Sequence, residues 1–494
     1  MEVLKGQSGY DEWNNRGVNL RFSGTPDFIV PVSSIEELMK AVNLCLEQNK
    51  YFVIRGGGHC LENFTANPSV QTIIDISQMK GVSYDPSRNA IKVAAGETVG
   101  QMLKKMHDQW GILLPVGEHP DIGMGGHIAG GAFGWLCRQL GLGVDYLDAI
   151  EVITVDHNRK LRKYIASNKP NDPNYELWWA HTGGGTGNFG IVTAYWFKMP
   201  TVATTVPSNL LPAVPKAVET IELEWSWNYL NEETFVQLLH NFGEWTIANS
   251  SPDSYSKFFF GTMHLFSVAV GKIQLKGLVT DSSKSEPLVK EFLKILNQNL
   301  AIKCEVKRTP MSWLDFALKP FPDIFYPGKM AFKVKDGFLY KPFTNQQALT
   351  IYHYLTGWKH LKGIFVGIAT YGGQVNAVDV DTTATVQRRA IFTTSCTAGW
   401  AEPEESEAYM SWVREAYQTL WSDQGGAPVP GSQAGGCIIA HPDNDLADPQ
   451  LNTSGTPWHT FYYQQHYSRL QQIKLKYDPL NIFHHALSIE PAPL

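Results

Sequence analysis

Residues 51–60 have the sequence YFVIRGGGHC. The four apolar residues at its start predict a buried strand, because they carry no charge and two of them are β-branched. The three glycines that follow permit a positive φ and leave no Cβ to hold a ligand away from the backbone. We expect Arg55 to meet a phosphate or an electron-rich carbonyl, and His59 to be held in place by the turn. Taken alone, the segment is weak evidence for a ligand site, and an ordinary tight loop with a satisfied histidine is the better interpretation of it.

The segments on either side of this turn predict a compact α+β unit. Ser34 with Glu37 is a capping-box pattern, and apolar residues then recur at helical spacing to about residue 48. Short strands are predicted at 72–76, 81–84 and 90–94, and a helix at 98–107. No helix with the Gly-x-Gly-x-x-Gly pattern follows the glycine turn, which argues against a doubly wound nicotinamide-binding fold.

A second glycine-rich segment spans residues 117–143, where nine of the 27 residues are glycine. Each glycine costs about 0.5–1 kcal/mol relative to alanine inside a helix or strand, so we expect neither element there. The segment instead predicts a loop whose backbone approaches a ligand closely. Strands predicted at 149–155 and 190–196 flank a further glycine turn at 182–187 and complete the first unit near residue 200.

Four prolines between residues 200 and 215 indicate a boundary. Beyond it, strands are predicted at 219–225, 257–265, 271–278, 302–307 and 363–371. They alternate with helices at 232–245 and 288–297, which begin after Asn231 and Ser285. This order predicts an antiparallel sheet with helices on one face, and we expect this part of the chain to cover the substrate.

The composition is that of a globular protein. The 494 residues are 43% hydrophobic and 18% charged, and the formal net charge is -6, whereas a nucleic-acid groove needs a clustered basic excess. Residues 1–21 contain no apolar run and no stretch of 18 apolar residues follows, so we expect neither a signal peptide nor a membrane anchor. The six cysteines form no CxxC pair, so we expect no disulfide framework, no metal site and a cytoplasmic location.

Three further blocks extend the pattern that begins with RGGGHC at 55–60. They are PVGEHPDIGMGGHIAGGAFGWLCRQLGLGVD at 115–145, WWAHTGGGTGNFGIVT at 178–193 and YYQQHYSRLQQIKLKYDPLNIFHHALSIEP at 462–491. In this order and spacing, the blocks resemble the berberine-bridge-enzyme-like FAD-linked oxidases of the vanillyl-alcohol-oxidase superfamily, which has a PCMH-type FAD-binding domain. The resemblance covers residues 28–490 and is greatest to bacterial natural-product oxidases of the aclacinomycin oxidoreductase and tirandamycin oxidase type.

The resemblance implies an α+β fold in three parts. Residues 1–200 would form a PCMH-type FAD-binding domain of two α/β subdomains. Residues 201–430 would form a substrate-binding domain with an antiparallel sheet covered by helices. Residues 431–494 would form a C-terminal berberine-bridge-like segment that returns to the FAD domain.

The resemblance also implies that FAD is attached covalently through His59. An imidazole is a good nucleophile toward the activated methyl group of the flavin once the ring is held in place. His119 stands where the family usually has a cysteine that makes a second bond, so we expect one covalent link and no cysteinyl link. Cys60 follows His59 in many relatives and is interpreted as a packing residue beside the cofactor.

The other residues expected at the cofactor come from the glycine-rich blocks and the C-terminal segment. They are Arg55, Gly56, Gly57, Gly58, Ile122, Gly123, Gly125, Gly126, His127, Gly130, Gly134, Gly187, Asn188, Gly190, Ile191 and His466. Ile122 corresponds to a residue proposed to gate dioxygen in plant relatives, where valine or isoleucine favours access. His466 replaces the asparagine that the family usually has near the flavin.

Three residues are predicted at the catalytic centre. His441, in GCIIAHPD at 436–443, replaces the tyrosine that acts as base in sugar oxidases of the family. Imidazole has a reference pKa of roughly 6.5 and is a competent base near neutral pH, and the alternative that His441 only lines the pocket stays open. Tyr463 is expected to form a hydrogen bond in the pocket. Phe133 stands where actinomycete relatives often have a second catalytic tyrosine, so one hydroxyl is missing.

The predicted function is that of an FAD-dependent oxidase. It would oxidise an alcohol or activated C–H group of a glycosylated or polyketide-type secondary metabolite, with dioxygen as acceptor. The alternative is an oxidative cyclase or oxygenase, or a non-redox cyclase, and a flavin-containing binding protein is a third hypothesis. The predicted partners are a small-molecule substrate and dioxygen, without nucleic acid or membrane, and the predicted assembly is a monomer or homodimer.

Overall fold

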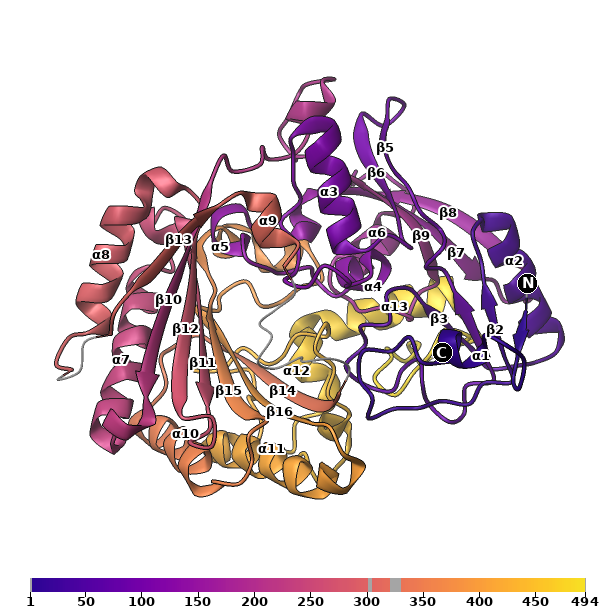
Figure 1. The fold of residues 1–494 in the computed structure, drawn as a ribbon. Coiled ribbons are helices and arrows are strands. Elements are labelled where there is room, and N and C mark those ends of the chain that lie inside the picture. Colours follow the sequence, from indigo (N-terminus) through magenta and orange to yellow (C-terminus); the bar gives the residue numbers. More distant parts are fainter. Residues whose placement is uncertain (1, 301–303, 320–329, 494) are drawn as a thin grey trace.

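The computed structural model describes residues 2–300, 304–319 and 330–493. Their strands form three sheets of four, five and seven strands. The two smaller sheets lie on one side of the molecule, and the seven-stranded sheet with its helices lies on the other (Figure 1). Helices and sheets in this arrangement confirm the predicted α+β class.

The first sheet contains the strand predicted at 51–54. Its order is β1 (Val3–Leu4), β2 (Phe28–Pro31), β4 (Thr72–Asp75) and β3 (Phe52–Arg55). Strands β2, β4 and β3 are parallel, whereas β1 runs antiparallel to β2. Helix α2 (Ile35–Glu47) connects β2 to β3 and begins where predicted, because the Ser34 side chain accepts a hydrogen bond from the backbone N–H of Glu37.

The second sheet is antiparallel, and both further glycine-rich segments lie between its strands. Its order is β5 (Val82–Asp85), β6 (Ala90–Ala94), β9 (Ile191–Phe197), β7 (Leu147–Val155) and β8 (Leu161–Ser167). The strands β5, β6, β7 and β9 lie close to the predicted ranges. Strand β8 was not predicted, because it is an edge strand with exposed charges at Arg162 and Lys163 in place of a regular apolar pattern.

Helix α3 (Val99–Trp110) begins at a reciprocal capping box between Thr98 and Gln101, at the start of the helix predicted at 98–107. The prediction of no helix at 117–143 is wrong, since the segment contains α4 (Met124–Ala129) and α5 (Cys137–Leu140). Helix α6 (Tyr175–Ala180) was also missed.

Glycine is required inside α4 because of close packing. The backbone N–H of Gly125 donates to the carbonyl oxygen of Ala95 at 3.0 Å. A Cβ on Gly125 would lie 3.1 Å from the same oxygen. The short helix therefore rests directly on the loop that follows β6, and its glycines serve contact rather than a turn.

The third sheet is antiparallel throughout. Its order is β13 (Lys307–Met311), β10 (Val218–Ser226), β12 (Lys272–Val279), β11 (Phe259–Phe266), β15 (Ile364–Thr370), β16 (Phe392–Trp400) and β14 (Ala331–Leu339). Its outer face is covered by α7 (Glu232–Ala248), α8 (Ser285–Leu296), α10 (Asn345–Gly357) and α11 (Ser406–Leu420) (Figure 1). The predicted antiparallel sheet with helices on one face is confirmed, and α9 (Trp313–Ala317) lies apart from these helices, against α3.

Several elements of this sheet differ from the prediction. Of the strand predicted at 302–307, residues 302 and 303 lie outside the described residues, and β13 begins only at Lys307. Strands β14 and β16 and helices α10 and α11 were not predicted. Strand β14 was missed because the charged residues Lys333, Lys335 and Asp336 interrupt its apolar pattern, although all three are buried.

Buried ion pairs join β14 to the N-terminal unit and to the C-terminal segment. Lys333 pairs with Glu62 and, at 2.6 Å, with Asp443. Lys335 pairs with Asp443 at 2.5 Å and with Asp445 at 3.1 Å. Removing charges from water is costly unless each has a partner in good geometry. The pairs therefore fix β14 against the N-terminal unit and against the segment that carries residues 436–443.

The C-terminal segment runs back to the first unit. Its helices are α12 (Trp458–Tyr463) and α13 (Tyr467–Tyr477), and α13 lies along the first unit (Figure 1). Arg469 makes two hydrogen bonds of 2.8 Å to Glu176 on α6. The buried ammonium of Lys474 donates to the carbonyl oxygen of Asn188 and pairs with Asp478 at 2.7 Å. These contacts hold α13 beside the 182–187 glycine turn.

The side chain of Arg55 makes its contacts within the first unit. Its Nε donates to Oδ2 of Asp75 at 2.7 Å, and its terminal nitrogens donate to backbone carbonyls at the end of α1 (Tyr10–Asn14). The residue is 3% exposed, and Arg16 pairs with the same Asp75 oxygen at 2.6 Å. The guanidinium is used within the protein, and its predicted contact with a phosphate or carbonyl of a ligand stays a prediction.

Three other features bear on the predictions from composition. No helix among residues 2–300, 304–319 and 330–493 has the length and hydropathy to cross a bilayer. The same described residues contain no group of three or more His, Cys, Asp or Glu side chains that could hold a metal ion. All six cysteines have free thiols.

The substitution Asp75→Asn should destabilise the first sheet, because it leaves the buried guanidinium of Arg55 without its anion. Breaking a buried ion pair from one side costs about 3–5 kcal/mol. We expect the midpoint of urea unfolding to fall accordingly, measured by tryptophan fluorescence. Asp27→Asn is the control, because the Asp27–Lys50 pair of 2.7 Å is exposed at the aspartate and should contribute under about 1 kcal/mol. Equal losses in both variants would contradict this account of Arg55.

Candidate active site

The first two glycine-rich segments meet backbone to backbone. A Cβ on Gly57 would lie 2.4 Å from the amide nitrogen of Gly123, and a Cβ on Gly123 would lie 2.4 Å from that of Gly57. Neither position can carry a side chain unless the backbone shifts. Gly58 then turns the chain with a φ of 75°, in the region that favours glycine. The contact fixes His59 relative to the 117–143 segment.

Three predicted histidines lie together at this contact. The rings of His59 and His119 are 4.8 Å apart, and Nε2 of His127 accepts a hydrogen bond from the backbone N–H of Gly117 at 2.8 Å. Burial, reinforced by the other two rings, lowers the pKa of His59 to about 3. Burial likewise lowers the pKa of His127 to about 4. His59 is therefore neutral at pH 7, which is the nucleophilic form of an imidazole.

His441 reaches the same region from the C-terminal segment. A Cβ on Gly130 would lie 3.1 Å from the Cβ of Ala440, so the second glycine segment touches the residue before His441. The ring centroids of His441 and Phe133 are 6.3 Å apart, and His441 is close enough to His127 to contribute to the lowering of its pKa. Burial lowers the pKa of His441 to about 4, while 37% of its side-chain surface stays accessible. The structure thus gathers four predicted residues, His59, His119, His127 and His441.

An acidic side chain that was not predicted faces this group. Asp336 on β14 has its Oδ2 3.8 Å from Nδ1 of His441. The same Oδ2 accepts from the backbone N–H of Ile438 at 3.3 Å, whereas Oδ1 is buried without a partner among the described residues. Burial raises the pKa of Asp336 well above its usual value, and the charge of Asp443 adds to the rise. No motif indicated Asp336, because β14 was not recognised as a strand.

Two buried tyrosine hydroxyls also lack a hydrogen-bond partner among the described residues. Tyr371, at the end of the predicted strand 363–371, has its ring 5.9 Å from that of Phe133. The hydroxyl of Tyr463 on α12 faces Gly185, because a Cβ on Gly185 would lie 3.0 Å from it. Buried polar groups are normally paired, so these hydroxyls indicate a ligand that supplies the partner. Tyr463 was predicted, whereas Tyr371 was missed although its strand was found.

Cys60 and Glu118 lie next to the histidines along the chain. Burial raises the pKa of the Cys60 thiol to about 11, so the thiol is uncharged at pH 7. Burial also raises the pKa of Glu118 to about 8, so this carboxyl is largely protonated at the same pH. Glu118 was overlooked although it stands inside one of the quoted blocks. Glu118 therefore places no full negative charge beside the histidines at pH 7.

At three other predicted positions, contacts within the protein explain why this type of residue is present. The side-chain amide of Asn188 donates to the carbonyl of Gly184, and its oxygen accepts from the N–H of Ile489. A Cβ on Gly190 would lie 2.6 Å from a backbone carbonyl oxygen of β7, and one on Gly134 would lie 2.0 Å from a carbonyl oxygen of its own loop. Contact of these residues with the cofactor through their backbone stays a prediction.

His466 is buried against the loop before β16. The residue is 4% exposed, with Nε2 2.9 Å from Oδ1 of Asp381 and Nδ1 3.3 Å from the carbonyl oxygen of Ala384. Its ring lies 5.0 Å from that of Trp179. Both ring nitrogens are used within the protein, and the expected position of His466 beside the flavin stays a prediction.

Two other predicted glycines are packed less closely. The nearest atom to a Cβ would be 3.9 Å away at Gly56 and 3.7 Å away at Gly126, which are ordinary van der Waals contacts, whereas a Cβ on Gly187 would lie 3.3 Å from the ring of His485. Ile122 is half-buried, whereas Ile191 is 2% exposed inside β9. Close approach of a ligand to the backbone of Gly56 and Gly126 stays a prediction.

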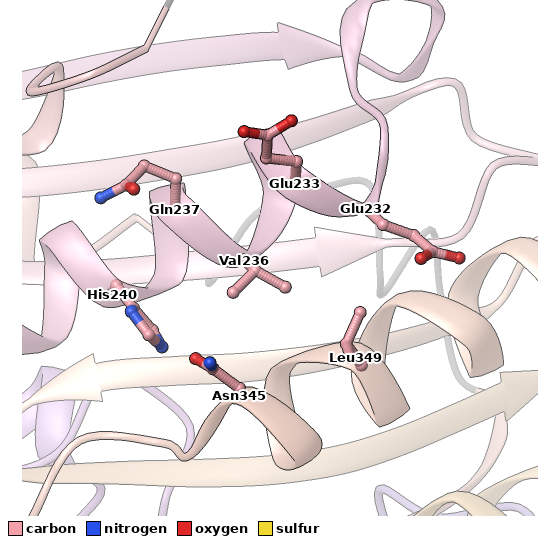
Figure 2. Close-up of a pocket in the computed structure, with 7 residues that line it drawn as sticks. All are labelled: Glu232, Glu233, Val236, Gln237, His240, Asn345 and Leu349. Carbon is pink, nitrogen blue, oxygen red and sulfur yellow. The ribbon is translucent and has the colours of Figure 1, made fainter.

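Two hollows are lined by residues other than the four histidines. One of about 430 Å³ lies between α7 and α10 and is lined by Glu232, Glu233, Val236, Gln237, His240, Asn345 and Leu349 (Figure 2). The other, of about 420 Å³, is lined by Tyr51, Asn63, Phe64, Asn67, Ser69, His484, His485 and Ala486. Neither contains a residue predicted for the site, and the first lies on the helical layer of the third sheet.

Two protein-family models match the chain. The FAD binding domain matches residues 26–158, which include both glycine segments at the Gly57–Gly123 contact. The family described as berberine and berberine like matches residues 440–490, from the residue before His441 onward. The matched regions are those that bring the four histidines together.

Known proteins resemble the chain over nearly its full length. The aclacinomycin-N/aclacinomycin-A oxidase of Streptomyces galilaeus is 38% identical over 483 residues, which are 98% of this chain and 88% of that protein. Among solved structures, an aclacinomycin oxidoreductase superposes with a TM-score of 0.96 at 37% identity, covering 100% of both chains. A glycopeptide hexose oxidase in complex with teicoplanin gives a TM-score of 0.95 at 37% identity, covering 99% of both chains.

The substitution Gly57→Ala should abolish most flavin binding, because its Cβ would meet the backbone of Gly123 at 2.4 Å and push the two glycine segments apart. We expect the ratio of flavin to protein absorbance to fall at least tenfold. Gly17→Ala is the matched control, since no atom lies within 4 Å of a Cβ there although the residue neighbours the same turn. Wild-type flavin content in Gly57→Ala would contradict the importance of this contact.

Proposed function

Because this chain belongs to the berberine-bridge-like family of FAD-linked oxidoreductases, we propose that it oxidises an alcohol or an activated C–H group of a glycosylated or polyketide-type metabolite. The enzyme is an FAD-linked oxidase. We further propose that one histidine carries the flavin and that another removes the substrate proton. The observation that supports this most strongly is the group of four histidines around the Gly57–Gly123 contact.

The residues of the site fit FAD. A Cβ on Gly56 or Gly126 would make only ordinary contacts, at 3.9 and 3.7 Å, and the hydroxyl of Tyr463 is buried without a partner among the described residues. We propose that residues 56–59 and 123–127 hold the cofactor. Bound FAD would accept a hydride from the substrate carbon and pass the two electrons to dioxygen, which becomes hydrogen peroxide.

His59 is the proposed point of covalent attachment. Its imidazole is neutral at pH 7, and the backbone contact beside it limits its position. His119 stands beside it with a ring-centroid distance of 4.8 Å, at the place where the family usually has a linking cysteine. Cys60, the nearest thiol in sequence, has a pKa raised to about 11, so it is a poor nucleophile at pH 7. We therefore propose one link, through His59.

His441 is the proposed base for the substrate. Its imidazole is neutral at pH 7 and keeps 37% of its surface accessible, so it can meet a substrate hydroxyl. Phe133, 6.3 Å away between ring centroids, offers an apolar surface beside it and no hydroxyl. The unpaired hydroxyls of Tyr371 and Tyr463 are available to orient the substrate or the cofactor. The proton of the oxidised alcohol would pass to His441.

The proposed substrate class rests on the relatives. An aclacinomycin oxidase and a glycopeptide hexose oxidase are each at least 37% identical to this chain and match it almost completely. The first name gives an aclacinomycin as the substrate, and the second gives a hexose of a glycopeptide. The three-part division at residues 200 and 430 and the monomeric or homodimeric state also stay proposals, as does a reducing cytoplasm, which the six free thiols support.

His59→Ala tests the covalent link. We expect wild-type protein precipitated with trichloroacetic acid to give a yellow pellet, because a bond to His59 survives denaturation. The pellet of His59→Ala should be colourless, with any flavin in the supernatant. His119→Ala is the matched control and should keep a yellow pellet. A colourless wild-type pellet would remove the covalent proposal, and a yellow His59→Ala pellet would move the link to another residue.

His441→Gln tests the base. General base catalysis contributes about 10²–10⁴-fold, so anaerobic flavin reduction should slow by that factor while flavin content is kept. The measurement is stopped-flow absorbance with aclacinomycin A, aclacinomycin N, teicoplanin and D-glucose as probes. His240→Gln, in the hollow of Figure 2, is the control and should reduce its flavin at the wild-type rate. An unchanged rate in His441→Gln would leave this histidine a lining residue.

Hydrogen peroxide separates the proposed oxidase from the alternative cyclase or oxygenase. An oxidase releases one peroxide for each substrate oxidised, because both electrons reach dioxygen. An oxygenase places oxygen in the product, and a non-redox cyclase consumes none. We expect peroxide and product to form at a one-to-one ratio, measured with a peroxidase-coupled dye and by chromatography. Product without peroxide would favour the alternative.

A further inference from the structure

We propose that Arg16, Val18 and Asn19 are positioning residues for His59, because they hold the turn around it in the place from which its imidazole can bond to the flavin. We name these three residues the clamp. The inference rests on the proposed covalent link and adds to it the part of the chain that promotes the link. The clamp precedes residues 26–158, which match the FAD binding domain, and no motif in residues 1–21 indicated it.

Two consecutive residues of the clamp bind the turn on either side of His59. The backbone N–H of Val18 donates to the carbonyl oxygen of Gly58 at 2.9 Å. This oxygen belongs to the planar peptide group that joins Gly58 to His59, so the hydrogen bond fixes the orientation of that group. The side-chain amide of Asn19 donates to the carbonyl oxygen of Leu61 at 2.8 Å. The backbone is therefore held immediately before His59 and again two residues after it.

Arg16 supports the same turn through its backbone. A Cβ on Gly58 would lie 2.5 Å from the carbonyl oxygen of Arg16, so the two chain segments are in direct contact. The side chain of Arg16 pairs with Asp75 at 2.6 Å and donates to the hydroxyl of Ser77 at 2.6 Å. These bonds anchor the clamp to the end of β4, the strand that pairs with β3.

Asn19 also ties the clamp to β14. Its Nδ2 donates a second hydrogen bond, of 2.9 Å, to the carbonyl oxygen of Phe332, and its Oδ1 accepts from the backbone N–H groups of Phe332 and Arg21, both at 3.1 Å. The backbone N–H of Leu20 donates to the carbonyl oxygen of Met330 at 3.0 Å. Asn19 is 4% exposed, and both polar atoms of its amide are used within the protein. The clamp is therefore a rigid support for the turn.

The chemistry proposed for His59 is sensitive to position. Attachment forms a C–N bond between the imidazole and the flavin methyl carbon, and it breaks one C–H bond of the methyl group and the N–H bond of the imidazole. The two protons and two electrons released in this way pass through the flavin ring to dioxygen, which becomes hydrogen peroxide. Reacting atoms must approach to about 3–3.5 Å, and a displacement of about 1 Å can slow such a step about 100-fold.

The two glycines before His59 face different supports. A Cβ on Gly57 would meet Gly123, whereas a Cβ on Gly58 would meet Arg16. The turn is therefore held by the second glycine-rich segment at one residue and by the clamp at the next. Loss of the clamp should free the peptide group before His59 and leave the Gly57–Gly123 contact in place. The clamp should thus affect covalent attachment far more than noncovalent binding of the flavin.

Asn19→Ala tests the clamp, with Asn14→Ala as the matched control. Each change removes a side-chain amide that donates to a backbone carbonyl oxygen, but Asn14 donates to Gly24 at 2.9 Å and not to the His59 turn. Apo-protein from riboflavin-starved cells is mixed with FAD, and total flavin and acid-stable flavin are measured over time. We expect attachment to slow about 10- to 100-fold in Asn19→Ala and to keep the wild-type rate in Asn14→Ala, with equal total flavin in all three proteins.

Arg16→Gln covers the case in which Asn19→Ala does not fold. The side chain of Arg16 is 29% exposed, and Arg55 keeps Asp75 paired at 2.7 Å, so the loss of stability should be small. The clamp loses its anchor to β4, and we expect attachment to slow about 3- to 10-fold, since the displacement of the turn is smaller. The covalent fraction of protein purified with its full complement of flavin gives the same comparison without apo-protein.

The outcomes separate this inference from the proposed function. Slow attachment in Asn19→Ala and Arg16→Gln, at wild-type total flavin and an unchanged rate in Asn14→Ala, supports the clamp. Wild-type attachment rates in both variants would overturn it. A loss of total flavin in proportion to covalent flavin would also overturn it, because the clamp would then serve the fold alone. Wild-type protein that is fully loaded and releases all its flavin in acid would instead remove the proposed link at His59, and the clamp with it.

Discussion

The direct contact between the backbones of Gly57 and Gly123 is the constraint on which the site depends. The two amides approach so closely that a Cβ on either residue would lie 2.4 Å from the amide nitrogen of the other. His59 and His119 are brought together by this contact and not by any bond between their rings. Burial then keeps His59 and His127 neutral, because their charged forms would lose hydration without gaining an anion. A structural requirement for glycine thereby determines the protonation state of the histidines.

The rest of the site depends on buried charges that join distant parts of the chain. Lys333 and Lys335 on β14 pair with Asp443, two residues after His441. These pairs fix the C-terminal segment relative to the third sheet, and the neighbouring Asp336 then faces His441 from the same strand. On the proposed function, loops of the first unit would hold the flavin, and the substrate would lie against β14 and the C-terminal segment. Oxidation would therefore take place where all three parts of the fold meet.

Much of this arrangement could be predicted from the sequence, where local rules were sufficient. The strand before the glycine turn, the capped helices α2 and α3 and the four histidines all had recognisable motifs. Strand β14 had none, because its buried lysines and aspartate interrupt the alternation that identifies a strand. The ion pair of Arg55 could not be predicted either, because its partner Asp75 becomes adjacent only through the pairing of β3 with β4. Interactions between residues far apart in sequence were the part that patterns could not supply.

The central claim is that the glycine contact holds an imidazole in bonding position against the flavin. Trypsin cleaves after Arg55 and Lys80 and releases residues 56–80, a peptide that contains His59 and lacks His119. Mass spectrometry of this peptide from wild-type protein is the most direct test. The account predicts a mass increase equal to one FAD, or to one FMN after phosphodiesterase treatment, with fragment ions that assign it to His59. An unmodified peptide from protein that is fully loaded with flavin would contradict it.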